Sequence, residues 1–303
     1  MSMGRTDGVC RHVFVWVVLS SVVLLSFRAH TARAAPYADT VGEQAGTDDT
    51  EVDIAGVVVT RDLANLNFQI NLTGDISTAN FGNYLVGLQT GPGGSTTLDT
   101  PWGKPVGISS GMNTWVGSWV NFGGGAQVYQ WDGVAWNLAT IGTVTLAANS
   151  TTVSLPLDSL GLASGTPIKF DVWSTYGAPG GQSAYDALDN PLTTVPDPWN
   201  GTPYDSAGGP LALFTLRDAD ANSDGVVDFN DLVALAQHYD GTGLWADGDF
   251  NGDGVVDFND LVLLAQHYNE GAGGAGQVVS VPEPGLAGLV GAMVIGLWRR
   301  RPG

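Results

Sequence analysis

The sequence predicts a mainly β protein, in which an antiparallel β-sandwich is followed by a small α-helical domain and a short C-terminal apolar helix. Residues 35–216 contain many short segments in which apolar and polar side chains alternate. Residues 217–270 contain one loop-and-helix sequence written twice. Each end of the chain has an apolar run beside arginines, as targeting segments do. These observations divide the 303-residue chain into five parts.

Residues 1–34 have the order of parts of a secretory signal peptide. Arg5 and Arg11 precede the apolar run VFVWVVLSSVVLLSF, and Ala32 and Ala34 then form an A-x-A cleavage site. The alternative is a membrane anchor, but the run is short for a membrane span. We therefore expect the chain to be exported and this segment to be removed.

Residues 35–216 have the composition of a β domain without thiol or imidazole chemistry. The only cysteine of the chain, Cys10, lies in the signal segment, and this region has no histidine. Disulfides, a cysteine nucleophile, Ser-His-Asp catalysis and His-ligated zinc are therefore excluded here.

The strand pattern of this region is clearest in LNFQINL at residues 66–72, where apolar and polar side chains alternate as in a half-buried strand. Similar segments are separated by Gly, Pro, Asn or Asp, and they predict about eight to ten antiparallel strands. Asp132 and Gly133 are typical of a short hairpin turn. A single helical turn is expected near LDSLGL at residues 157–162. The further strand segments begin at residues 53, 83, 113, 126, 134, 150, 167 and 211.

Several tryptophans of the β region are candidates for binding glycan. Trp115 and Trp119 lie four residues apart on one predicted strand and so share a face, while Trp131 and Trp136 flank the predicted hairpin. Sugar rings stack on such side chains, and nearby Asn, Gln and Asp supply hydrogen bonds. The alternative is that these tryptophans fill the core of the sandwich.

The repeated segments, residues 220–239 and 249–268, each begin with an acidic 12-residue loop. Side-chain oxygens stand at positions 1, 3, 5, 9 and 12, glycine at position 6 allows a sharp turn, and position 7 offers a backbone carbonyl. This spacing surrounds one hard cation, and Ca²⁺ fits better than Mg²⁺ because the ligands are numerous and flexible. The sequence therefore predicts two Ca²⁺ ions, without which the loops are poorly ordered because their carboxylates repel one another. The predicted ligands are Asp220, Asn222, Asp224, Val226, Asp228 and Asp231, and Asp249, Asn251, Asp253, Val255, Asp257 and Asp260.

Each loop is followed by one short helix whose apolar stripe cannot be buried alone, so we expect the two copies to pack together. His238 and His267 are expected to be solvated residues at the helix ends rather than metal ligands. The predicted stripes are Leu232, Leu235, Ala236 and Tyr239, and Leu261, Leu264, Ala265 and Tyr268.

Two loop-helix repeats with Asp at position 12 resemble a type I dockerin, and the resemblance covers residues 218–269. It implies that the loops hold calcium and that the helices bind a cohesin module. The family usually has small hydroxyl residues at positions 10 and 11, where this chain has Phe229 with Asn230 and Phe258 with Asn259. This departure leaves the calcium ligands intact but opens an alternative, in which the phenylalanines dock on the neighbouring β domain as an intramolecular partner.

Residues 271–280 form a Gly-rich linker, and residues 281–303 have the order VPEP, then a fourteen-residue apolar run, then Arg299–Arg301. The run is below the roughly 20 residues that a membrane span needs, although a plain tail anchor is an alternative. The order resembles the PEP-CTERM sorting signal. That resemblance implies transient membrane insertion, cleavage near residues 282–284 by an exosortase-type enzyme, and delivery to the cell surface or extracellular matrix of a Gram-negative-type bacterium.

The opening of the β region, YADTVGEQAGTDDTEVDIAGVVVTRDLANLNFQINL at residues 37–72, loosely resembles the first strands of family 9 carbohydrate-binding modules and of the C-terminal modules of glucodextranase-like proteins. The resemblance implies a non-catalytic sandwich that binds sugar or a surface.

The charge of the chain limits the classes of partner that it can bind. The formal net charge is −19, and removing both ends leaves Arg61, Lys104, Lys169 and Arg217 as the only Lys or Arg side chains. Such a surface repels nucleic acid and anionic lipid. Together with the acidic loops and the two end segments, this leads us to expect an exported, calcium-binding, non-catalytic protein of the cell surface or matrix that binds polysaccharide or another surface component.

Two alternatives stay open. One is a purely structural envelope protein. The other is a carboxylate-based glycoside hydrolase, which is disfavoured because the only glutamates of the β region are Glu43 and Glu51 and no Asp pair forms a recognisable motif. We accordingly expect no catalytic residue.

Overall fold

The computed structural model describes residues 37–42, 48–77, 81–96, 100–107, 111–177, 183–188, 204–205 and 211–272. All of them belong to one compact unit. The expected signal segment, the sorting segment, residues 273–280 of the linker and Trp199 lie outside the described residues. Within the described part, no helix has the length and apolar character needed to cross a membrane.

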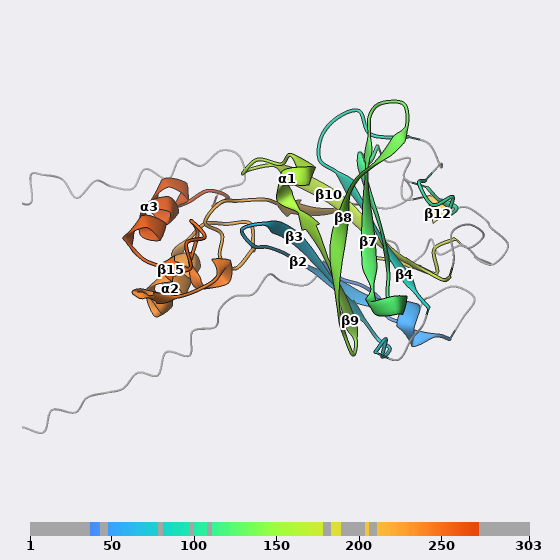
Figure 1. The fold of residues 1–303 in the computed structure, drawn as a ribbon, viewed down its shortest axis with the longest axis horizontal. Helices are drawn as coiled ribbons and strands as arrows, with labels where there is room; N and C mark the ends of the chain where they lie inside the picture. The colour runs from blue at the N-terminus through green and yellow to red at the C-terminus, as the bar shows by residue number, and fades with distance from the viewer. Residues whose placement is uncertain are drawn as a thin grey trace, which may run out of the picture. The chain divides into compact units, whose positions relative to one another are not determined.

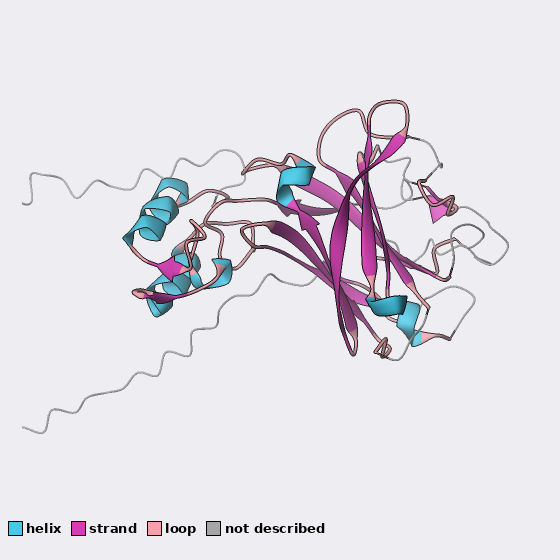
Figure 2. Ribbon diagram, viewed as in Figure 1, coloured by secondary structure: helices cyan, strands magenta, loops and turns pink. Residues whose placement is uncertain are grey.

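The described fold is mainly antiparallel β, as predicted, with few and short helices (Figure 1; Figure 2). One eleven-stranded sheet contains all but four of the named strands. Its order is β1 (Tyr37–Ala38), β2 (Ile54–Arg61), β3 (Asn65–Leu72), β9 (Ser150–Pro156), β8 (Trp136–Ala147), β7 (Gly125–Trp131), β6 (Thr114–Trp119), β4 (Asn83–Gln89), β10 (Pro167–Thr175) and β11 (Asp186–Ala187), and β13 (Ala212–Thr215) also pairs with β10. The predicted helical turn is α1 (Leu157–Leu160).

The sheet is continuous because β8 pairs along one part of its length with β7 and along the other with β9. The pairing with β7 ends at Gly142 opposite Ala126, and the pairing with β9 begins at Thr143 opposite Ser154. A Cβ at Gly142 would lie 3.0 Å from the carbonyl oxygen of Ser154 and 3.2 Å from Cβ of Ala126. The strand therefore changes partner at a residue that has no side chain to crowd the crossing.

β8 joins two parts of the sheet, which we call leaves: β1, β2, β3 and β9 on one side, and β7, β6, β4 and β10 on the other. The two leaves enclose one apolar core. Phe68 of β3 meets Phe170 of β10 edge to face, with ring centroids 5.4 Å apart, and Tyr37 meets Phe170 in the same manner at 5.0 Å. Along β3, buried and half-buried side chains alternate, as the sequence predicted. Each large apolar side chain buried here contributes roughly 1.5–3 kcal/mol to folding.

Residues 217–272 form a separate small core around α2 (Phe229–His238), α3 (Phe258–His267) and the 3₁₀ turn η5 (Trp245–Asp247). The two helices contact each other, as their apolar stripes predicted. Two short strands, β14 (Gly241–Thr242) and β15 (Val255–Val256), pair within the same region. The buried members of this core are Ala219, Ala221, Val227, Ala234, Leu235, Trp245, Phe250, Val256 and Leu264.

In each helix, two of the four residues predicted to form the buried apolar stripe are exposed. Ala236 and Ala265 are exposed, and Tyr239 and Tyr268 are 42% and 40% exposed. Both helices end one residue before the tyrosine, whose ψ of about 135° leaves the helical conformation. The stripe therefore does not continue to that position.

We predict that Phe170→Ala destabilises the β domain by about 3–5 kcal/mol, because Phe170 is fully buried between the two leaves. Urea unfolding followed by tryptophan fluorescence measures this loss. The matched control is Phe122→Ala, since Phe122 is 99% exposed and its loss should change stability by less than about 0.5 kcal/mol. Equal effects of the two substitutions would contradict the core described here.

Candidate functional site

The two acidic loops have the same hydrogen-bond pattern, beginning with their last aspartate. Asp231 accepts backbone N–H bonds from Ala221 at 2.9 Å and from Asp228 at 2.8 Å. Asp260 accepts the equivalent bonds in the second loop at 2.8 and 2.9 Å. Both carboxylates are fully buried. Each therefore ties the start of its loop to the start of the helix that follows.

The first aspartate of each loop holds the sharp turn at position 6. Asp220 accepts a 2.9 Å bond from the N–H of Gly225, and Asp249 accepts a 3.0 Å bond from that of Gly254. The two glycines have φ of +85° and +86°. This is the left-handed region that other residues rarely adopt, so glycine stands here for the reason the sequence predicted.

The intervening loop positions are bonded to one another and to the helix ends. Asn222 donates from Nδ2 to Asp224 at 2.9 Å, and Asp224 accepts a 2.9 Å bond from the N–H of Val226. Asp228 caps α2 by accepting a 2.7 Å bond from the N–H of Asn230. The second loop repeats all three bonds through Asn251, Asp253 and Asp257.

Three carboxylates of the first loop lie within electrostatic range of one another. Burial, to which the negative charges of Asp231 and Asp224 add, raises the pKa of Asp220 to about 7 against the opposing bond from Gly225. Burial also raises the pKa of Asp231, and the charge of Asp224 contributes. Burial and the neighbouring carboxylates thus disfavour the ionised forms of Asp220 and Asp231, and a bound cation would favour those ionised forms instead.

The carboxylates of the loops point to backbone N–H groups and do not surround one centre. In the ranges that the structure describes, no group of three or more His, Cys, Asp or Glu side chains is arranged so that it could hold a metal ion. The predicted ligands, which include two asparagines and two backbone carbonyls, therefore lie in the two loops, but their oxygens do not point to a common centre.

The two copies complete each other through position 8 of each loop. Val227, in the first loop, donates to the carbonyl of Glu270 at 2.9 Å and accepts from the N–H of Asn269 at 2.8 Å, beyond α3. Val256, in the second loop, accepts a 2.9 Å bond from the N–H of Asp240, beyond α2. Both valines are fully buried. Neither loop has its backbone bonds satisfied without the other copy, which gives a physical reason for the duplication.

The two histidines of the repeats contact other groups of the chain, whereas the two phenylalanines are largely exposed. His238 lies 2.9 Å from the carbonyl of Ala234, and His267 lies 2.9 Å from Glu270. Both histidines are half-buried rather than fully solvated. Phe229 and Phe258 are 65% and 64% exposed. The hypothesis that these phenylalanines dock on the β domain is therefore wrong, because each lies on the first turn of its helix with its ring in solvent.

Trp115 was predicted as a glycan-binding residue, and its burial contradicts that prediction. It has no exposed surface, and it packs edge to face on Trp102 and Tyr129 at 5.2 and 5.8 Å. Val106 and Tyr204, from segments that the sequence did not assign to the core, pack in the same cluster. Trp115 thus lies in a second core on the outer face of β6 and cannot present a ring to a sugar in this structure.

Trp119 and Trp102 remain partly exposed on that outer face. A Cβ on Gly125 would lie 2.2 Å from the ring of Trp119, and a Cβ on Gly117 would lie 2.6 Å from that of Trp102. Two strand glycines therefore make room for the indoles to lie close to the sheet. The centroids of the two rings are 6.0 Å apart.

A glutamine fixes the polar side of this aromatic cluster. Oε1 of Gln127 accepts bonds from Nε1 of Trp102 at 2.9 Å and from the hydroxyl of Tyr129 at 3.0 Å. The sequence pattern did not select Trp102, Gln127 or Tyr129, although glycines at the partner positions of two strands were a usable signal. Trp131 and Trp136 face each other across the β7–β8 pair at 5.4 Å, beside the predicted hairpin, and both are half-buried.

No protein-family model matches this chain, and no curated protein matches it. The dockerin-like, PEP-CTERM-like and carbohydrate-binding-module-like features therefore stay predictions from sequence motifs.

Without a divalent cation, we predict that the helical domain becomes less stable as the pH rises from about 4 to 7. The pKa of Asp220 is about 7 in the folded chain against an ordinary value of 3.8, so the folded state binds a proton that the unfolded state releases in this range. Linkage limits the loss to about 4 kcal/mol. Thermal unfolding in EDTA, followed by circular dichroism at pH 5 and pH 7.5, measures it.

The matched variant for this prediction is Asp220→Asn, which removes the titrating group. Its melting temperature should change less between the two pH values than that of the unaltered chain. The same pH dependence in both proteins would show that Asp220 is not the source.

Proposed function

We propose that the paired loops bind two calcium ions and that the protein is an exported, non-catalytic component of a cell surface or extracellular matrix. The observation that carries the proposal is the identical arrangement of the two loops around a buried aspartate at position 12. Position 6 glycines with positive φ and a carboxylate with a raised pKa are consistent with it. The ligands would be the loop residues predicted from the sequence.

Calcium would supply the positive charge that the loops lack. Burial raises the pKa of Asp220 and of Asp231, the negative charge of Asp224 adds to both increases, and backbone N–H bonds offset only part of them. Small rotations of side chains that now accept N–H bonds would bring further oxygens to a common ion. The two loops are joined through Val227 and Val256, so both copies must be folded for either loop to have its backbone bonds satisfied.

We further propose that the β domain is a sandwich-like module that binds a neutral polysaccharide at the cluster of Trp102, Trp119, Gln127 and Tyr129. Its support is the two indoles that lie partly exposed beside an amide held in a fixed orientation. The excess of acidic side chains disfavours an anionic polymer as ligand. The alternative is a purely structural envelope role. The burial of Trp115 is consistent with that alternative, because this ring is not available to a sugar.

Export and surface attachment belong to the same proposal. They rest on the signal-peptide pattern of residues 1–34 and on the PEP-CTERM-like pattern of residues 281–303. The exposed Phe229 and Phe258 offer a helix-end surface to an external partner such as a cohesin-like module.

We predict two calcium-binding events when residues 35–280 are titrated with Ca²⁺ in a calorimeter. Asp231→Asn should abolish one event and Asp260→Asn the other, because each removes the charged carboxylate at position 12 of one loop. Asp240→Asn is the matched control, since Asp240 is exposed and lies outside both loops. Absence of heat in the unaltered chain would reject the calcium proposal.

We predict that Trp119→Ala weakens retention on an immobilised neutral polysaccharide at least about tenfold, because it removes a ring face for stacking. Affinity electrophoresis over a panel of neutral and acidic glycans measures this. Phe122→Ala is the control, since it removes an exposed aromatic ring outside the cluster. No retention of the unaltered chain on any glycan would favour the structural role, and release of reducing sugar would establish the hydrolase alternative.

A further inference from the structure

The turn between β2 and β3 lies between the two acidic loops and contacts position 4 of each. On one side, the backbone N–H of Arg61 donates to Oγ of Ser223 at 3.2 Å. On the other, a Cβ placed on Gly252 would lie only 2.0 Å from Cδ2 of Leu63. Ser223 and Gly252 are equivalent residues of the two loops, and both have positive φ, at +58° and +74°. One hairpin turn is thus held by the matching position of both copies.

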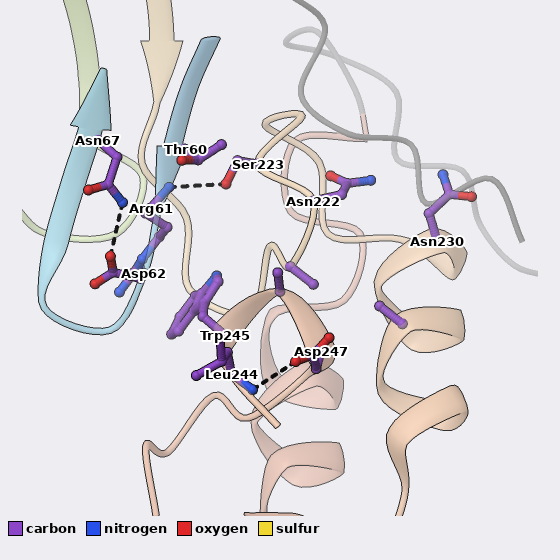
Figure 3. Close-up of a pocket in the computed structure, with 13 residues that line it drawn as sticks. Thr60, Arg61, Asp62, Asn67, Asn222, Ser223, Asn230, Leu244, Trp245 and Asp247 are labelled. Carbon is purple, nitrogen blue, oxygen red and sulfur yellow. Dashed lines mark hydrogen bonds between the residues drawn. The ribbon is translucent and has the colours of Figure 1, made fainter. Parts of the chain in front are cut away.

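Arg61 links this turn to the first predicted ligand of the first loop. Its guanidinium carbon lies 3.9 Å from the ring centre of Trp245, which stands beside it in Figure 3. The indole N–H of Trp245 in turn donates to the backbone carbonyl of Asp220 at 2.8 Å. Nη1 of Arg61 also donates to Asp218 at 2.6 Å and to the carbonyl of Arg217 at 3.0 Å. The guanidinium therefore contacts the loop's entry segment and the residue that fixes its first position.

The interface around these contacts is open. A cavity of about 460 Å³ lies beside Arg61, with Asn67 on the β side and Asn222 and Asn230 on the loop side (Figure 3). The side chain of Arg61 is only 9% exposed. A charge so deeply buried is costly unless its partners are in place, and those partners, Asp218, the carbonyl of Arg217 and the ring of Trp245, lie beside the folded first loop.

We propose that the β2–β3 turn is the internal partner of the paired calcium loops, and that calcium binding and docking of the turn stabilise each other. This inference rests on the proposed calcium function. Without a cation the loop carboxylates repel one another, and the loop backbone that receives Arg61 and Leu63 loses its order. With calcium bound, the same backbone is fixed and the turn is held.

Such coupling is reciprocal, so it can be measured from either side. The factor by which docking raises calcium affinity equals the factor by which calcium strengthens docking, and such factors are typically 5- to 150-fold. The two sites should respond to different residues. The backbone N–H of Arg61 contacts the first loop at Ser223, and its guanidinium reaches Asp220 of that loop through Trp245, so Arg61→Ala removes only the guanidinium contact. Leu63 contacts the second loop at Gly252.

The test titrates residues 35–280 with Ca²⁺ by calorimetry in the unaltered protein and in three variants. Arg61→Ala should weaken one of the two sites at least about fivefold and leave the other nearly unchanged. Lys169→Ala is the matched control, because it removes the same charge from an exposed position of β10 and should leave both sites unchanged. Leu63→Ala should weaken the site that Arg61→Ala spares, and circular dichroism confirms that each variant folds.

A second measurement needs no variant. Hydrogen exchange of residues 58–66 in the unaltered chain should be slower with calcium than with EDTA. Two calcium sites whose affinities are the same in Arg61→Ala and Leu63→Ala, with exchange of the turn unaffected by calcium, would overturn the inference but keep the calcium function. Absence of any calcium binding would reject both.

Discussion

Two carboxylates that have no contact with solvent, Asp231 and Asp260, set the arrangement of the helical domain. A buried carboxylate must be given hydrogen-bond donors or a cation, because the loss of water is otherwise too costly. Each of these accepts N–H bonds from both ends of its loop and so fixes where the loop starts and where its helix begins. The turn of the β domain contacts the loops in that fixed form, and the attachment of the two domains therefore depends on the same buried charges.

The two copies are nearly identical in sequence but meet different surroundings. At position 4, the first has Ser223, which accepts a bond from the turn, and the second has Gly252, where a larger residue would collide with Leu63. At position 2, the first has Ala221 and the second has Phe250, whose ring packs on Trp245 at 5.2 Å. These two differences between the repeats thus fall where the repeats touch the rest of the chain, while the predicted ligand positions are kept the same.

The local patterns of the sequence predicted much of this structure. Alternation identified β3, the Asp132-Gly133 pair marked the turn between β7 and β8, and position 6 of each loop required the glycine that stands there. What local patterns could not predict depends on distant segments. Burial of Trp115 comes from residues such as Val106 and Tyr204, which carry no periodic signal. The continuity of the sheet depends on a change of partner in the middle of β8, where the strand pattern itself does not change.

The bonds that join Val227 to Asn269 and Glu270 also bring the two ends of the helical domain together. Arg217, at the entry, donates from Nε to the carbonyl of Gly225 at 2.6 Å and lies 3.7 Å from the carboxylate of Glu270 at the exit. If the chain is tethered beyond residue 272, a pulling force passes from the β domain to the tether through this clasp and bypasses both helices. This clasp is then the first contact to break under load, and the two helices and the second loop carry no load until it opens.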